Sequence, residues 1–128
     1  MFTILYGYAD LGLFLVRLIV GIIFIYHGLP KLRRARAFAA GMGMSAPAVF
    51  LVGLVETLSA VALIVGFQVQ PAALALAFIM VGATYKKIFT WGIPFSAPDK
   101  MGWEFDVVLL ASALALATTG GGSIRLFF

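Results

Sequence analysis

The sequence predicts an all-α protein, a four-helix transmembrane bundle with both termini on the extracytoplasmic side. Of its 128 residues, 63% are hydrophobic and only 11% are charged, whereas about a quarter are charged in an ordinary soluble domain. A protein this small needs polar side chains to cover its surface in water. The composition therefore excludes a soluble domain, a disordered chain and a nucleic-acid binder, and it indicates a single membrane domain over residues 1–128.

Four apolar segments are each long enough, at about 20 residues, to form a helix that crosses a bilayer. The first is interrupted only by Arg17 and His27, and the second only by Glu56. The third is rich in alanine, and the fourth carries Glu104 and Asp106 in its first turn. We expect helices over about residues 11–29, 47–67, 69–90 and 103–120.

The basic residues are distributed unevenly between the two ends of these segments. Apart from Arg17, seven of the eight Lys and Arg residues lie in two connections, over residues 30–46 and 86–102, that an even number of spans places on one side. Cytoplasmic loops carry the excess of Lys and Arg, so we expect both termini outside and a multi-pass protein of the cell (inner) membrane. The seven are Lys31, Arg33, Arg34, Arg36, Lys86, Lys87 and Lys100, and the eighth is Arg125.

Arg17 and Glu56 are the charges placed deepest in apolar segments, where a charge is costly and usually faces the bundle interior. We estimate their axial separation at roughly 6–8 Å from the helical rise, and we expect a direct ion pair. The pair either only fixes helix register or also takes part in binding a polar head group, a proton or a quinone. Each charge falls on a helical stripe that should face inward: Gly21, Phe24 and Gly28 accompany Arg17, and Gly53, Ser59 and Ala60 accompany Glu56.

His27 and Glu104 are expected at a similar depth near the cytoplasmic end. A His–carboxylate pair there would relay protons or bond a quinone carbonyl, although we favour a histidine satisfied by water or backbone. Asp106, on nearly the opposite face of the helix from Glu104, is expected to be solvated. The inward stripe expected on this helix comprises Glu104, Ala111, Ala115 and Thr118.

The chain lacks cysteine and has one histidine, so we expect no metal site and no cofactor bound by this chain alone. It shows no nucleophile–base arrangement, and no catalytic residue is assigned. The intramembrane polar site expected from the residues therefore consists of Arg17, Glu56, His27 and Glu104.

Several short motifs occur in a defined order. The first segment contains Arg17-Leu18, Gly21, Phe24, His27-Gly28 and Lys31-Leu32; Glu56, Leu63 and Gly66 follow, then Gly102-Trp103-Glu104, Gly120 and Gly122. This order resembles the DoxX family of small four-helix membrane proteins over about residues 11–123. The chain departs from the family after Ser123, where Ile124 and Arg125 replace a usual Leu-Asp.

The resemblance implies a role beside a redox enzyme, because some family members are described as a small subunit of a thiosulfate:quinone oxidoreductase. We expect an accessory, non-catalytic subunit of a respiratory or other oxidoreductase complex, in contact with quinone or lipid and associated with other membrane protein subunits. The alternatives are a small-molecule transporter or channel acting as an oligomer, and a structural membrane scaffold. Neither alternative requires a redox partner.

Overall fold

The computed structural model describes residues 2–126, and this part of the chain is helical, with no strand. A 3₁₀ helix, η1 (Thr3–Tyr8), leads into the long helix α1 (Ala9–Arg33), and a short helix α2 (Ala35–Met42) follows. The remaining elements are α3 (Ala46–Val65), α4 (Val69–Tyr85), the π-helical turn η2 (Lys86–Thr90) and α5 (Trp103–Thr119). The four expected ranges are therefore helical, to within a few residues at their ends.

Two features differ from the expected connection between the first two helices. Helix α1 continues through Pro30 to Arg33. Proline removes one N–H donor from the helix but not an acceptor, and the carbonyl of Pro30 accepts a hydrogen bond from the Arg34 N–H at 2.8 Å. The alanine-rich stretch that follows favours helix and forms α2, which ends at Gly43 in the left-handed conformation.

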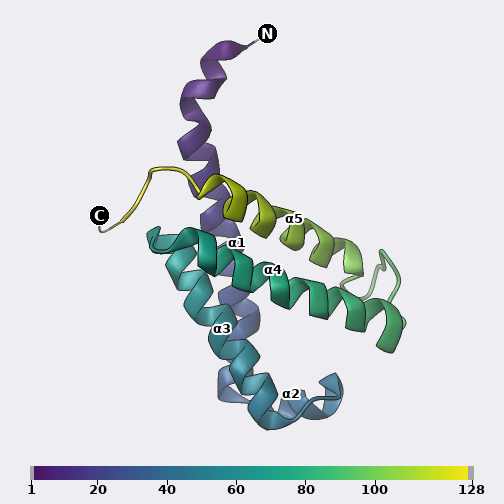
Figure 1. The fold of residues 1–128 in the computed structure, drawn as a ribbon. Coiled ribbons are helices and arrows are strands. Elements are labelled where there is room, and N and C mark those ends of the chain that lie inside the picture. Colours follow the sequence, from purple (N-terminus) through teal and green to yellow (C-terminus); the bar gives the residue numbers. More distant parts are fainter. Residues whose placement is uncertain (1, 127–128) are drawn as a thin grey trace.

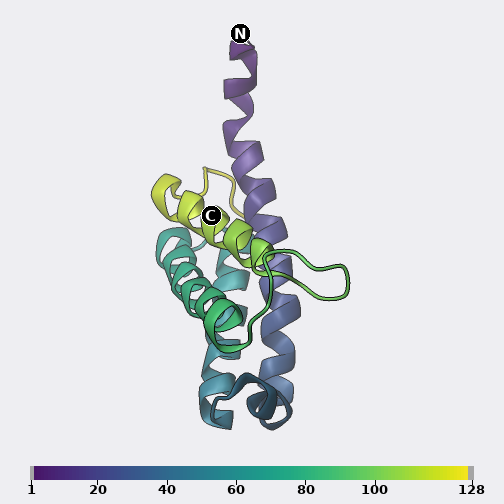
Figure 2. The ribbon, with the colours of Figure 1, turned by 90° about the vertical axis from the view of Figure 1, so that its right-hand side faces the viewer.

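The helices pack as two pairs (Figure 1). Helices α1 and α3 lie antiparallel along one direction, and α4 and α5 form a second pair that crosses the first steeply (Figures 1 and 2). The pairs lie close together where α3 turns into α4. At the other end they diverge, with α2 below and the α4–α5 connection to the side (Figure 1).

Close approach of α1 and α3 depends on small residues at their contact. A Cβ atom at Gly28 would lie 2.9 Å from the Cβ of Glu56, and one at Gly53 would lie 2.7 Å from the Cβ of Lys31. Small residues allow membrane helices to approach in this way. The predicted inward stripes of the first two helices, which begin at Arg17 and Gly53, are confirmed because all their members are buried.

The expected inward face of the last helix is wrong. Glu104 and the other three members of that stripe are exposed. The buried face carries Asp106, Leu109 and Ala113 and continues with Leu116 and Ala117. These residues also repeat at helical spacing, and their side chains complete the core with α4, so α5 is rotated by roughly half a turn from the expectation.

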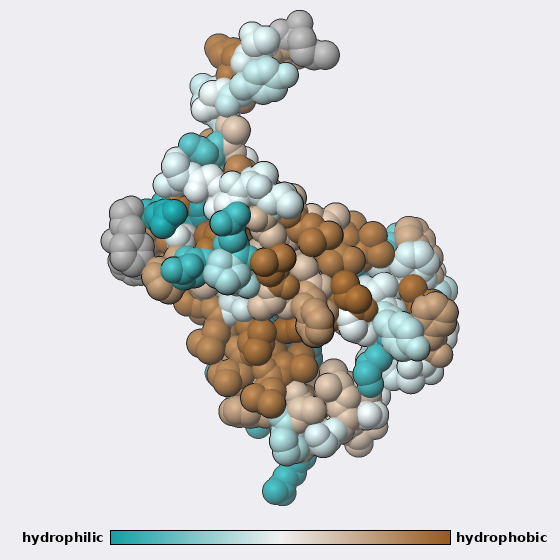
Figure 3. Space-filling model, in the orientation of Figure 1, coloured by the Kyte–Doolittle hydropathy of each residue, from teal (hydrophilic) through white to brown (hydrophobic). Residues whose placement is uncertain are grey.

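The outer faces of the helices are apolar. Ile19, Leu58, Phe78 and Val108 are among the large hydrophobic side chains that are more than half exposed, and such side chains cover α3, α4 and α5 in Figure 3. Three helical stretches are long and apolar enough to cross a membrane: residues Thr3–Arg33, Ala46–Val65 and Val69–Thr90. The chain is therefore a multi-pass membrane protein in contact with lipid.

Candidate functional site: a charged cavity between the helix pairs

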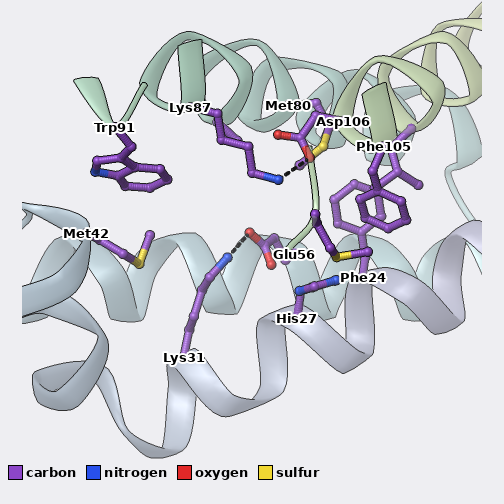
Figure 4. A pocket seen from close by; sticks show the side chains of 13 residues that line it. Phe24, His27, Lys31, Met42, Glu56, Met80, Lys87, Trp91, Phe105 and Asp106 are labelled. Atoms are coloured by element: carbon purple, nitrogen blue, oxygen red, sulfur yellow. Dashed lines mark hydrogen bonds and ion pairs between the residues drawn. The ribbon is translucent and has the colours of Figure 1, made fainter. Parts of the chain in front are cut away.

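A cavity of about 190 Å³ lies where the two helix pairs diverge. Side chains from α1, α2, α3, α4, η2 and α5 line it, together with the α4–α5 connection. Figure 4 shows two ion pairs at its centre, one from α1 and α3 and the other from η2 and α5, which approach from opposite sides. Its walls are mostly aromatic and sulfur-containing: Phe24, Met42, Met80, Trp91, Met101 and Phe105.

Each ion pair joins a lysine to a buried carboxylate. The Nζ atom of Lys31 lies 2.7 Å from Oε1 of Glu56, and the Nζ atom of Lys87 lies 3.0 Å from Oδ1 of Asp106. The carboxylate side chains are only 2% and 5% exposed, whereas both lysine side chains are 16% exposed. The acidic side chains of the two pairs are therefore more deeply buried than their lysine partners.

Each carboxylate uses only one of its two oxygens. Oε2 of Glu56 and Oδ2 of Asp106 are buried and have no hydrogen-bond partner in the described structure. Buried polar atoms in proteins are nearly always hydrogen-bonded, and an exception calls for a specific reason. Two unpartnered acceptors in the lining of one cavity are suited to a ligand that donates hydrogen bonds.

His27 adds a fifth polar side chain to the two ion pairs of the cavity. It lies one turn before Lys31 on α1 and is half-buried beside the ring of Phe105, at 6.0 Å between centroids. The cavity therefore combines acceptors, donors and flat apolar walls. Within residues 2–126, however, no three His, Cys, Asp or Glu side chains cluster as a metal site requires.

The predicted ion pair between Arg17 and Glu56 is wrong. Arg17 is fully buried and donates hydrogen bonds to backbone carbonyls, at 2.8 Å to Leu63 and 2.5 Å to Ile124. Glu56 lies level with Gly28, eleven residues or about 16 Å along α1 from Arg17. Because α1 extends beyond its expected end, the two helices α1 and α3 pair in a different register. Arg17 therefore contacts the end of α3, and Glu56 contacts Lys31.

The other expected pair, His27 with Glu104, also takes a different form. Glu104 is exposed and does not line the cavity, whereas Asp106 is 3% exposed and does. Two residues along a helix lie about 200° apart, so only one of these acids faces inward. The expectation that Asp106 is solvated is corrected by its burial and its bond to Lys87.

Sequence reasoning missed Lys31 and Lys87 because a basic residue at the end of a span also satisfies the positive-inside rule. One available signal was the spacing of His27 and Lys31, four residues apart and so on one helix face. No comparable signal connected Lys87 with Asp106, which are nineteen residues apart and separated by an irregular connection. Of the four predicted site residues, the structure brings Glu56 and His27 together at the cavity and leaves Arg17 and Glu104 outside it.

Comparisons with known proteins bear on the chain as a whole. The DoxX family model matches residues 12–91. A protein of Bacillus subtilis (strain 168) named "Putative oxidoreductase CatD" is 28% identical over 120 residues, which cover 91% of this chain and 85% of that protein. No solved structure gives a significant match.

Proposed function

This chain belongs to the DoxX family, and we propose that it is a membrane subunit of an oxidoreductase that binds the head group of a quinone or quinol in the charged cavity. The observation that carries the proposal is the pair of half-satisfied carboxylates, Glu56 and Asp106, in the lining of one cavity with aromatic walls. The name of the Bacillus subtilis relative, an oxidoreductase, supports the same class of function.

The chemistry of the cavity suits both redox forms of such a ligand. The hydroxyl groups of a quinol donate to the free oxygens of Glu56 and Asp106. The carbonyl groups of a quinone accept hydrogen bonds from Lys31, Lys87 or a His27 N–H. When the quinol is oxidised, its two protons pass to the carboxylates and its two electrons pass to a redox centre of a partner subunit. The chain thus serves as an accessory subunit that holds the ligand and receives protons.

The proposal includes four membrane-spanning helices with both termini on the extracytoplasmic side of the cell membrane. Helix α5 has 17 residues, about 25 Å of helix, which is the short limit for a span. The two basic connections meet, because Lys86 Nζ donates a hydrogen bond to the carbonyl of Met42 at 3.0 Å. Their shared end, which also carries the mouth of the cavity, is the cytoplasmic end by the positive-inside rule.

Tryptophan fluorescence tests the head-group site, because Trp91 lines the cavity and a quinone quenches a nearby indole. Replacing Trp103 by Phe leaves Trp91 as the only tryptophan of the chain. In lipid nanodiscs, menadione should quench it saturably. Menadiol, the corresponding quinol, should displace menadione, and the change Asp106→Asn should raise the dissociation constant of menadiol about tenfold, equivalent to one lost hydrogen bond of about 1.4 kcal/mol.

The matched control is Glu104→Gln, which neutralises an exposed acid in the same helical turn and should leave quenching unchanged. Thermal unfolding should show that each variant remains folded. Displacement by menadiol that is equally effective in the parent and in Asp106→Asn would contradict the proposed site. A folded protein that shows no saturable quenching would favour a structural scaffold.

A further inference from the structure

A second cavity, of about 250 Å³, adjoins the charged cavity on the side of α3 and α4. The two share five lining residues, and the Lys31–Glu56 ion pair stands in the wall between them. The surface in Figure 3 is hollowed between α3, α2 and the end of α4, where this second cavity lies. The shared residues are Lys31, Met42, Glu56, Ala83 and Trp91.

The second cavity adjoins a groove on the outside of α3 and α4. Val52, Phe78 and Ile79 line both this cavity and a groove of about 300 Å³ on the outer face of α3 and α4. Every side chain of that groove is apolar, and Phe78 is 83% exposed. Two adjoining hollows therefore lie between Glu56 and a face of the protein that contacts lipid, and only three apolar side chains separate them.

We propose that the ligand is an amphiphile that enters sideways from the bilayer, with its apolar tail lying between α3 and α4 and its head group at Glu56. This inference rests on the proposed head-group site and adds the class of ligand, one with a long apolar tail, and its route of entry. The polar end and the apolar end of the path match the two ends of such a molecule.

The size of the second cavity favours a hydrocarbon chain over a protein helix as its occupant. A helix with its side chains is about 10–12 Å wide, too wide to occupy a cavity of about 250 Å³ whose lining includes an ion pair. A single hydrocarbon or isoprenoid chain fits this shape. A helix docked on the outer groove alone would also leave the free oxygen of Glu56 without a donor.

Gly82 offers a way to close the path without disturbing the fold. It lines the second cavity but not the charged cavity, and a Cβ atom at this position meets nothing within 4 Å. The change Gly82→Phe therefore fills the path, and Gly82→Ala leaves it largely open. The control is Val81→Phe, one residue away at a side chain that is 55% exposed and outside the lining of either cavity.

The experiment compares two probes with the same head group, tail-less menadione and a menaquinone carrying four isoprenoid units, in nanodiscs. Gly82→Phe should weaken binding of the tailed probe at least tenfold and that of menadione less than twofold. Gly82→Ala and Val81→Phe should change neither by more than twofold. Equal effects of Gly82→Phe on both probes, or no effect on either, would overturn the inference.

A separate readout keeps the inference testable if no quinone binds. A long-chain alcohol with a diazirine in its tail should, on illumination, label the peptides that contain Val52 and Phe78, and Gly82→Phe should reduce this labelling at least fivefold. Labelling without quinone binding would reject the proposed function and retain the tail path. Labelling that is equal in Gly82→Phe would reject the path, whichever head group binds.

Discussion

Replacing Arg17 by Met should destabilise the protein because this side chain completes the end of α3. The last four carbonyls of an α-helix have no partner within the helix. Here the carbonyl of Ala62 accepts from the Gly66 N–H, and that of Val65 accepts from the Leu126 N–H. The remaining two, at Leu63 and Ile64, accept from the Arg17 guanidinium.

The same guanidinium holds the C-terminal segment through the carbonyls of Gly121, at 3.2 Å, and Ile124, at 2.5 Å. A hydrogen bond to a charged group contributes about 1.5–3 kcal/mol. The two short bonds, to Leu63 and Ile124, together contribute about 3–6 kcal/mol on this scale, and the two longer ones add little. The positive charge also lies favourably at the negative end of the α3 dipole.

Reversible unfolding in mixed detergent micelles measures the effect. Arg17→Met should lower the free energy of unfolding by about 3–6 kcal/mol. Arg17→Lys should lose a smaller amount, because lysine keeps the charge but lacks the planar fork that reaches several carbonyls at once. A loss below about 1 kcal/mol for Arg17→Met would contradict this account of the α3 end.

A double-mutant cycle with Glu56 distinguishes this account from direct pairing. The two side chains have separate partners, so the effects of Arg17→Met and Glu56→Gln should add to within about 0.5 kcal/mol. Glu56→Gln alone should destabilise the protein by weakening its bond to Lys31. A coupling energy well above 1 kcal/mol would contradict separate roles and support a direct ion pair between Arg17 and Glu56.

Three further results are expected. A reporter active only in the cytoplasm should work when inserted at Pro98 and fail when fused after residue 128, and the reverse pattern would contradict the proposed orientation. Gly28→Leu should lower the melting temperature by forcing α1 away from α3, because a Cβ atom there would lie 2.8–2.9 Å from side-chain atoms of α3. Gly12→Leu should leave the melting temperature unchanged, because a Cβ atom at this position meets nothing within 4 Å. Lys31→Met leaves a buried carboxylate unpaired and should lower the free energy of unfolding by about 3–5 kcal/mol. An equal loss for Arg33→Met, at an exposed position, would argue against the ion pair.

The helices could be predicted because their apolar segments are long. The buried faces of α1 and α3 could be predicted because small and charged residues gather on one side of each helix. Runs of about 20 apolar residues leave little choice but a helix in a membrane. On α1 and α3, the stripes at Arg17 and Glu56 combine glycine with a charge, and both features favour the protein interior. These two faces were therefore predictable without knowing which helix each would meet.

The face of α5 could not be predicted in the same way. Alanine occurs on both sides of this helix, at Ala111 and Ala115 as well as at Ala113 and Ala117. Acidic residues also occur on both sides of its first turn, and the choice between Glu104 and Asp106 depends on where Lys87 lies. The irregular connection after η2 determines that position, and no sequence period describes it.

The buried charges of this protein differ in how completely they are satisfied, and that difference separates structure from function. Arg17 has four partners, and all are backbone carbonyls. Looking for an acidic partner in the sequence cannot identify them. Glu56 and Asp106 each have one lysine and one free oxygen at a cavity. Leaving a buried acceptor unsatisfied costs about 1–3 kcal/mol, a cost that the fold alone does not explain and that a bound hydrogen-bond donor removes. The charge predicted to be central to the site therefore maintains the fold, and the half-satisfied acids belong to the proposed ligand site.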